Sequence, residues 1–198
     1  AETFRQIPGA PIAYWASENA FDAFSAGSLL RDVGLPRQGL ATGENDRFLR
    51  AWWEVPHLLF KSDCGSLADA SECGKKWFPY NKGGDFRRWY GNYHYVIAFD
   101  SENRGILSNQ GNHLPSRQLY FRPSITWSLI SSSVSAFRYR KPGSLFDVAG
   151  MSMFPGEEYF KKVIALCNSS VTSAFLSFIA PTINYQAGYI AKIPYFFD

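Results

Sequence analysis

The feature that most constrains the fold is a series of short runs, rich in aromatic and β-branched residues, that fills residues 77–146. Gly, Asn and Pro separate these runs, so each run has the length and composition of a strand. We expect strands at residues 77–78, 86–90, 93–99, 119–121, 125–131, 136–139 and 145–148. Further short strands are expected upstream, at residues 12–15, 29–33, 38–42 and 48–55. The polar residues 61–74 and 101–118 are predicted to be loops.

The period of the apolar residues changes near the C-terminus. Apolar residues repeat at helical spacing over residues 157–167 and again over residues 171–179, until Pro181 ends the second helix. Ser17 is expected to cap another helix through residue 26, which Gly27 ends. A β-rich body closed by a C-terminal helical hairpin belongs to the α+β class. We expect a single domain with an opening segment (1–37), a β-rich body (38–150) and a helical closing segment (151–198).

The composition is that of a folded chain. Of its 198 residues, 46% are hydrophobic and 19% are charged, which is enough apolar content for a core and too little charge for disorder. No apolar stretch is long enough to span a membrane, and the first residues lack the pattern of a signal peptide. We therefore expect no membrane partner.

Three cysteines, Cys64, Cys73 and Cys167, are expected to be reduced thiols in the cytoplasm. Cys64 and Cys73 share one predicted loop and could form a disulfide instead. A zinc site made from these two thiols and His57 would lack a fourth ligand at regular spacing, so no metal ligand is predicted.

Positive charge is concentrated in the middle of the chain. Residues 1–74 hold six Lys and Arg against ten Asp and Glu, whereas residues 75–92 hold five basic residues and one acid. Residues 103–146 hold six basic residues and no acid. Such clustering can create a local field that attracts a polyanion such as nucleic acid, although a solvated face could also carry it by chance.

The motifs of common enzymes are missing. There is no G-x-S-x-G, no G-x-x-x-x-G-K-[ST] phosphate loop and no H-E-x-x-H, and no two glycines are separated by a single residue. We therefore predict no catalytic residue and no cofactor-binding residue in this chain.

The densest candidate for binding is residues 75–92, which contain five cations and six aromatic residues. Cations bind phosphates and planar rings pack on sugars or bases, while residues 81–84 look like a turn that brings backbone N–H groups close to a ligand. The alternative is that the aromatic residues form core and the cations a solvated rim. The candidate DNA-binding residues here are Lys75, Lys76, Asn81, Lys82, Gly83, Arg87 and Arg88. Arg122, Arg138, Arg140 and Lys141 would extend the same basic track.

A second candidate is the loop around Thr42, Gly43 and Asn45. Flexible glycines let such a loop enter a groove, the Thr42 hydroxyl can reach a base or phosphate, and Asn45 can make a bidentate contact with adenine. The alternative is an ordinary connection in which Asn45 only caps the following segment.

At these residues the chain resembles a known family. The motifs are Gly39-Leu40-x-Thr42-Gly43-x-Asn45-x-x-Phe48, then Lys76-Trp77-Phe78-Pro79-Tyr80-Asn81-Lys82-Gly83-Gly84-x-Phe86-Arg87-x-Trp89-Tyr90-Gly91-Asn92. Residues 124–132, 146–150, 166–169, 184–188 and 193–194 also fit. Together they resemble the PglX adenine-specific DNA methyltransferases of BREX phage-defence systems and, more broadly, the C-terminal specificity domain of Taq- and Eco57-type enzymes. The resemblance runs from about residue 12 to residue 194.

The resemblance implies a division of labour. In that family a catalytic domain binds S-adenosylmethionine and methylates the exocyclic amine of adenine, and a target-recognition domain grips duplex DNA and chooses the site. This chain matches the recognition part only, because the cofactor loop and the Asn-Pro-Pro-Tyr motif are missing. We therefore expect no cofactor in this chain and S-adenosylmethionine in the parent enzyme, whose catalytic activity is not expected here.

The partners implied by the resemblance are double-stranded DNA, the catalytic methyltransferase domain of the same parent chain and other defence-system proteins, in the bacterial cytoplasm. Two alternatives remain open. One is a protein-interaction module of a defence complex, and the other is a carbohydrate-binding module, which an aromatic content of 17% would suit.

Overall fold

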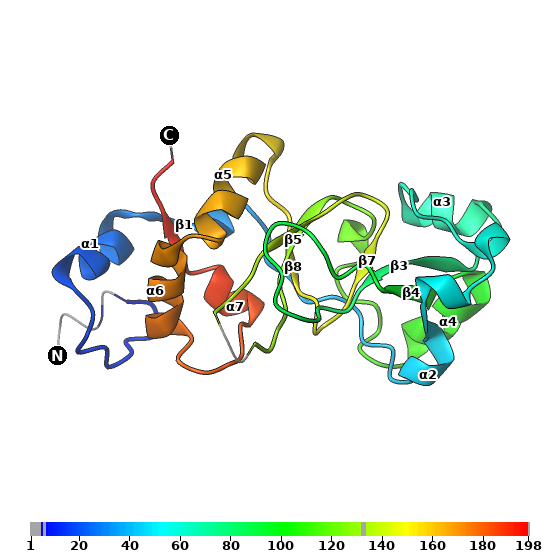
Figure 1. The fold of residues 1–198 in the computed structure, drawn as a ribbon, viewed down its shortest axis with the longest axis horizontal. Coiled ribbons are helices and arrows are strands. Elements are labelled where there is room, and N and C mark those ends of the chain that lie inside the picture. The colour runs from blue at the N-terminus through cyan, green and yellow to red at the C-terminus, as the bar shows by residue number, and fades with distance from the viewer. Residues whose placement is uncertain (1–4, 6, 132–133, 198) are drawn as a thin grey trace.

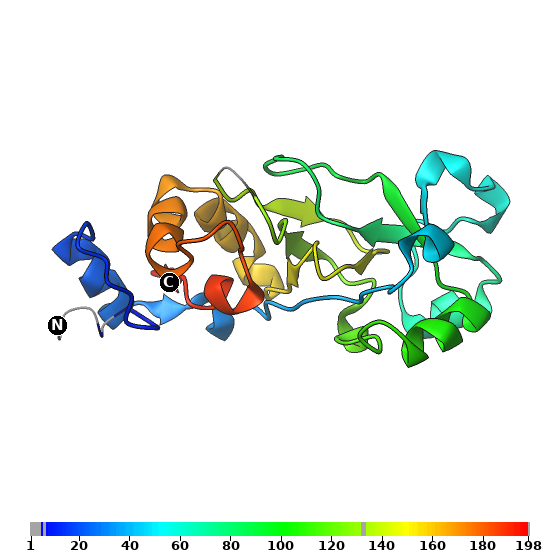
Figure 2. The same ribbon diagram turned by 90° about the horizontal axis from the view of Figure 1, so that it is seen from below.

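The computed structural model describes residues 5, 7–131 and 134–197. It confirms the α+β class and shows an elongated molecule with helices gathered at both ends and strands between them (Figures 1 and 2). The helices are α1 (Glu18–Ala26), α2 (Asn45–Phe48), α3 (Leu67–Glu72), α4 (Ser101–Asn109), α5 (Glu157–Cys167), α6 (Ser170–Ile179) and α7 (Ala187–Ile190). The strands are β1 (Ser28–Leu29), β2 (Leu49–Ala51), β3 (Trp77–Asn81), β4 (Tyr95–Ala98), β5 (Ser124–Thr126), β6 (Arg138–Arg140), β7 (Leu145–Phe146), β8 (Ser152–Met153) and β9 (Pro194–Tyr195).

The strands form three small sheets. One has the order β2-β4-β3-β7, with β3 and β7 parallel and the other pairs antiparallel. A second has the order β6-β5-β8 and is antiparallel, and the third pairs β1 with β9. Residues 37–40 join the first two sheets, because Arg37 bridges to Ser152 and Leu40 bridges to Asp147.

Two apolar clusters hold the molecule together. Around β3 and β4, the buried ring of Phe78 packs edge-on against Phe99 and Phe121. The other cluster centres on Trp127 and Phe137 and includes buried residues of α1, α5 and α6. Residues near both ends of the chain therefore share one core, and Figure 1 shows the two termini at the same end of the molecule.

Three predicted helices, α1, α5 and α6, are confirmed. α1 begins after Ser17, whose hydroxyl accepts from the Ala20 N–H, and Gly27 ends it. α5 has the predicted bounds, and α6 stops before Pro181. The pair forms a corner, with a bend of 77° between the two helices. No single described helix is long and apolar enough to cross a membrane, and α5 and α6 reach that length only together across their bend.

Several predicted strands are wrong. Residues 12–15 and 119–121 contain turns, and residues 86–90 form only one bridge, between Trp89 and Arg138. The strands predicted at 29–33 and 48–55 shrink to β1 and β2, each followed by a 3-10 turn, and residues 38–42 make only the Leu40 bridge. The predicted strands 93–99 and 145–148 contain the shorter β4 and β7, and residues 77–78 are the start of the longer β3. The strands predicted at 125–131 and 136–139 overlap β5 and β6 by two residues each.

Two predicted loops contain helices. α3 lies within residues 61–74 and begins after Ser66, whose hydroxyl accepts from the Asp69 N–H. α4 lies within residues 101–118 and begins after Asp100, whose carboxylate accepts from the Asn103 N–H. Both caps follow a standard pattern, since short polar side chains satisfy the free N–H groups of a first turn.

Candidate nucleic-acid interface

The main surface feature is the connection between β3 and β4, residues 82–94, which we call the 82–94 loop. Instead of turning tightly between two antiparallel strands, it extends along the molecule and lies against β6 (Figure 2). The Trp89 N–H donates to the Phe137 carbonyl at 2.9 Å, and the Tyr139 N–H donates to the Trp89 carbonyl at 2.9 Å. The loop is therefore an arc that is anchored at β6 and spans the sheet β2-β4-β3-β7 and the sheet β6-β5-β8.

Glycine is required where the arc leaves β3. Gly83 has φ +79°, and a Cβ there would lie 2.6 Å from the Ala149 carbonyl oxygen. Gly84 has φ +110°, and its carbonyl accepts from the Ser128 hydroxyl at 2.7 Å. A side chain at Gly83 would push the loop away from its support. Residues 81–84 do not form the predicted turn: Asn81 is the last residue of β3, and Gly83 and Gly84 lead the chain on into the 82–94 loop.

The tip of the arc presents rings and cations to solvent. Phe86, Trp89 and Tyr90 are 53%, 52% and 67% exposed, and Arg87 and Arg88 between them are also exposed. The Arg88 guanidinium lies 5.6 Å from the centre of the Phe86 ring. Guanidinium groups pair with phosphates and exposed rings stack on bases or sugars, so this tip has the chemistry of a nucleic-acid contact.

The second sequence motif meets the 82–94 loop at Lys82. The Thr42 hydroxyl donates to Asn45 Oδ1 at 2.7 Å, and Lys82 Nζ donates to the same oxygen at 3.3 Å. Lys82 Nζ also lies 2.7 Å from Asp147 Oδ2. The structure therefore brings together two motifs that stand apart in the sequence.

Asp147 lies at the buried side of this junction. Its side chain has no exposed surface, and it accepts from the Tyr80 hydroxyl and, at 2.6 Å, from the Ala149 N–H. Burial and the neighbouring Asp147 carboxylate raise the pKa of Tyr80 well above its usual value, so Tyr80 stays a hydrogen-bond donor. The buried Asp147 carboxylate consequently fixes the position of the Lys82 side chain.

Asn45 does not cap α2. It is the first residue of that helix, and Glu44 occupies the cap position without a side-chain hydrogen bond. Asn45 is exposed, and within the described part of the chain its Nδ2 donates no hydrogen bond. Thr42 is only 2% exposed, so its hydroxyl orients Asn45 and does not face solvent.

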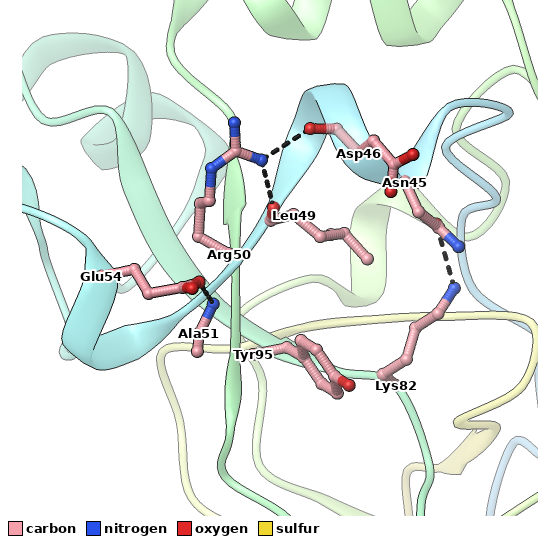
Figure 3. Close-up of a pocket in the computed structure, with 8 residues that line it drawn as sticks. All are labelled: Asn45, Asp46, Leu49, Arg50, Ala51, Glu54, Lys82 and Tyr95. Atoms are coloured by element: carbon pink, nitrogen blue, oxygen red, sulfur yellow. Dashed lines mark hydrogen bonds between the residues drawn. The ribbon is translucent and has the colours of Figure 1, made fainter.

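An open hollow lies beside this junction. It is a cavity of about 550 Å³, and its lining includes Asn45, Lys82, Arg50 and Tyr95; Figure 3 shows how these side chains lie around it. A neighbouring cavity of about 300 Å³ shares Ala51 and Tyr95 with the first and extends to Gly83 and Gly84. Arg50, Trp53 and Tyr95 also line these cavities, although no sequence motif pointed to them. The adjacent tryptophans at 52 and 53, 53% and 60% exposed, are the signal that could have indicated this hollow.

Some predicted site residues lie elsewhere on the surface. Lys75 and Lys76 precede β3, and five residues of strand, about 16 Å, separate them from Lys82. Lys75 Nζ donates to the Leu58 carbonyl at 2.7 Å. Arg122 and Lys141 are exposed at the far end of the β5–β6 pair, where Ser124 faces Arg140.

Besides Thr42 and Gly83, three further predicted site residues are buried. Asn81 is 1% exposed, and its Nδ2 donates to Thr126 Oγ1 and, at 2.7 Å, to the Gly150 carbonyl. Arg138 and Arg140 are 1% and 2% exposed and lie beneath the 82–94 loop. All three hold protein groups together and reach no solvent in this structure.

The cysteines and acidic residues form no obvious ligand set. All three cysteines are free thiols, so the disulfide considered for Cys64 and Cys73 is absent. The described residues contain no group of three or more His, Cys, Asp or Glu side chains placed to hold a metal ion.

Comparison with known proteins points to one class of enzyme. No family model matches the chain. The adenine-specific methyltransferase PglX of Lacticaseibacillus casei (strain Zhang) is 39% identical over 200 residues, which is 96% of this chain and 16% of PglX. The adenine-specific methyltransferase BrxX of Escherichia coli O9:H4 (strain HS) is 33% identical over 195 residues, 96% of this chain and 15% of BrxX. The chain is similar to one segment of PglX and BrxX. It spans about a sixth of the length of either protein.

Proposed function

We propose that this chain is the target-recognition part of an adenine-specific DNA methyltransferase of a bacterial phage-defence system. In this proposal the chain binds duplex DNA in the cytoplasm and selects the site, while another part of the parent protein transfers the methyl group. The observation that carries the proposal is the junction at Lys82, where an exposed amide adjoins an arc of exposed cations and rings. The similarity to adenine-specific methyltransferases supports it.

The surface assigns different tasks to different residues. Arg87 and Arg88 would grip phosphates, and the rings beside them would stack on sugars or bases. Asn45 would read a base edge through its Nδ2 donor, because its Oδ1 already accepts from Thr42 and Lys82. A single donor favours a base with a major-groove acceptor and gives less discrimination than the bidentate contact expected from the sequence.

S-adenosylmethionine would belong to the rest of the parent protein. The adjacent glycines, Gly83 and Gly84, are the place where this chain could offer a backbone cradle, but the Gly83 N–H already donates to Asn81 Oδ1 at 3.4 Å. We therefore propose that this chain contributes no residue to the cofactor site.

The test is duplex-DNA binding by fluorescence anisotropy across a salt series. Replacing both Arg87 and Arg88 by Ala should flatten the slope of log K against log salt by up to about 1.8, which is 0.9 for each phosphate contact. Lys75→Ala with Lys76→Ala is the matched control, because these lysines lie at the opposite end of β3 and should change the slope by less than about 0.5. An unchanged slope after loss of both arginines would remove the arc from the interface.

One observation favours a protein-interaction module as a second function. Residues 52–59 expose Trp52, Trp53, Leu58 and Leu59, by 53%, 60%, 80% and 40%, and Trp53 lines the smaller cavity. Large exposed apolar side chains that cluster often mark a protein contact. Weak, salt-insensitive DNA binding by the intact chain would favour this second function.

A further inference from the structure

Two arginines lie beneath the exposed arc because of strand geometry. Side chains alternate along β6, so Arg138 and Arg140 point to one face and Tyr139 points to the other. Tyr139 is 39% exposed and packs edge-on against Phe160, whereas both arginines are almost completely buried. The face that they share is covered by the 82–94 loop.

Each arginine holds the loop by a backbone carbonyl. Arg138 Nη1 donates to the Arg87 carbonyl at 3.3 Å, and Arg140 Nη1 donates to the Asn92 carbonyl at 3.2 Å. The Arg140 guanidinium also lies 3.9 Å from the centre of the Tyr93 ring. The Arg87 carbonyl lies within the exposed tip and the Asn92 carbonyl lies two residues beyond it, so the arginines hold the segment that would meet DNA at two points.

All other partners of the two guanidinium groups are neutral. Arg138 also donates to the Ala136 carbonyl and to Ser128 Oγ, and Arg140 Nε donates to Ser144 Oγ at 3.0 Å. Neither arginine forms an ion pair with any residue that the structure describes. Among the residues that the structure describes, Arg138 Nε and Arg140 Nη2 find no hydrogen-bond partner.

Burying two positive charges without a carboxylate partner lowers the stability of the folded chain. Burial lowers the pKa of both arginines to about 10, and at neutral pH both groups remain charged. Neutral side chains could have filled the same space. The retained charge is explained if a polyanion supplies the counter-charge from outside the loop.

We propose that Arg138 and Arg140 are positioning residues for DNA binding, which pin the arc through the Arg87 and Asn92 carbonyls and supply unpaired charge that the DNA backbone compensates. This inference rests on the proposed DNA-binding function. It assigns a role to two arginines that touch no phosphate themselves. It also separates two effects, pinning through hydrogen bonds and attraction through charge, which different substitutions can isolate.

The experiment combines hydrogen exchange with DNA binding in the 198-residue chain. Arg140→Met removes both effects, so amides of residues 82–94 should exchange about tenfold faster and DNA affinity should fall about tenfold, as for one lost charge-assisted hydrogen bond. Arg140→Lys keeps the charge but loses the planar fork, so exchange should still rise while affinity at low salt recovers to within about threefold of wild type. Arg122→Met, which removes an exposed arginine near the same strand pair, should leave exchange in the loop unchanged.

The outcomes are separable. Unchanged exchange of residues 82–94 in both Arg140 variants would overturn the pinning role, and this readout needs no DNA. Wild-type affinity in Arg140→Met, or equal loss in the Lys and Met variants, would overturn the role of the charge. Exchange of β3 and α5 amides reports whether a variant is folded, and if Arg140→Met unfolds, Arg140→Lys decides. Failure of the wild-type chain to bind DNA would overturn the proposed function and leave the exchange result standing.

Discussion

The Lys82–Asp147 ion pair should be the energetic link between the two loops of the site. Lys82→Met leaves the Asp147 carboxylate fully buried, with two hydrogen-bond donors and no counter-charge. Removing one partner of a buried pair costs about 3–5 kcal/mol. Because the Lys82 side chain is 26% exposed and partly screened by water, we take a lower value, about 2–3 kcal/mol. For a chain of this size that lowers Tm by roughly 4–12 °C.

The assay is a double-mutant cycle by urea and thermal denaturation, with Lys82→Met, Asp147→Asn and the double variant. The second substitution removes the buried charge that the first leaves unpaired, so the coupling energy should be about 1–2 kcal/mol. Lys61→Met is the matched control. Lys61 is 23% exposed, like Lys82, but its partners Asp63 and Asp69 are 84% and 36% exposed. Its loss should cost clearly less than the loss of Lys82, because water screens exposed ion pairs.

A refuting result is equally clear. If Lys82→Met costs no more than Lys61→Met, or if the cycle shows additive effects, Asp147 does not hold Lys82 energetically. The two loops would then be neighbours without a stabilising link, and the junction at Lys82 would no longer support the proposed DNA-binding function.

The remaining predictions concern packing, thiols and cofactor. Gly39→Ala should destabilise the chain by about 2 kcal/mol or more, because its Cβ would lie 1.8 Å from the Phe146 carbonyl oxygen. Gly105→Ala should stabilise the chain by about 0.5–1 kcal/mol, because a Cβ inside α4 would meet open space. Equal urea midpoints for the two variants would contradict both predictions. Iodoacetamide at pH 8 should label half-buried Cys73 before Cys64, because burial raises the pKa of Cys64 to about 12 and keeps that thiol protonated. Mass spectrometry that finds Cys64 labelled first would contradict this prediction. Calorimetry of this chain with S-adenosylmethionine should show no saturable heat, and a micromolar isotherm would refute that expectation.

Local signals in the sequence predicted three helices, α1, α5 and α6, although the equally local caps of α3 and α4 were missed. The apolar faces of α5 and α6 and the Ser17 cap are readable within a few residues, and all three are present. The strand predicted at residues 86–90 failed because strand pairing depends on distant partners. Its Trp89 adopts φ +70° and bridges only Arg138, a contact that composition does not reveal.

The candidate site was recognised as two motifs, and their meeting point was not. Lys82 contacts Asp147 because β3 pairs in parallel with β7, a register that no local pattern specifies. Period-two alternation could have shown that Arg138 and Arg140 share one face of a strand. It could not have shown that this face is the covered one, since that depends on where the 82–94 loop lies.

The most direct test of target recognition is to replace the matching segment of the Lacticaseibacillus casei PglX with this chain and to map methylated adenines by single-molecule sequencing. We predict that methylation moves to a sequence different from that of unmodified PglX. Asn45→Ala in the same chimera should relax one base position by about 1–3 kcal/mol. A chimera that methylates the original PglX site, with an unchanged preference at every position, would contradict the account.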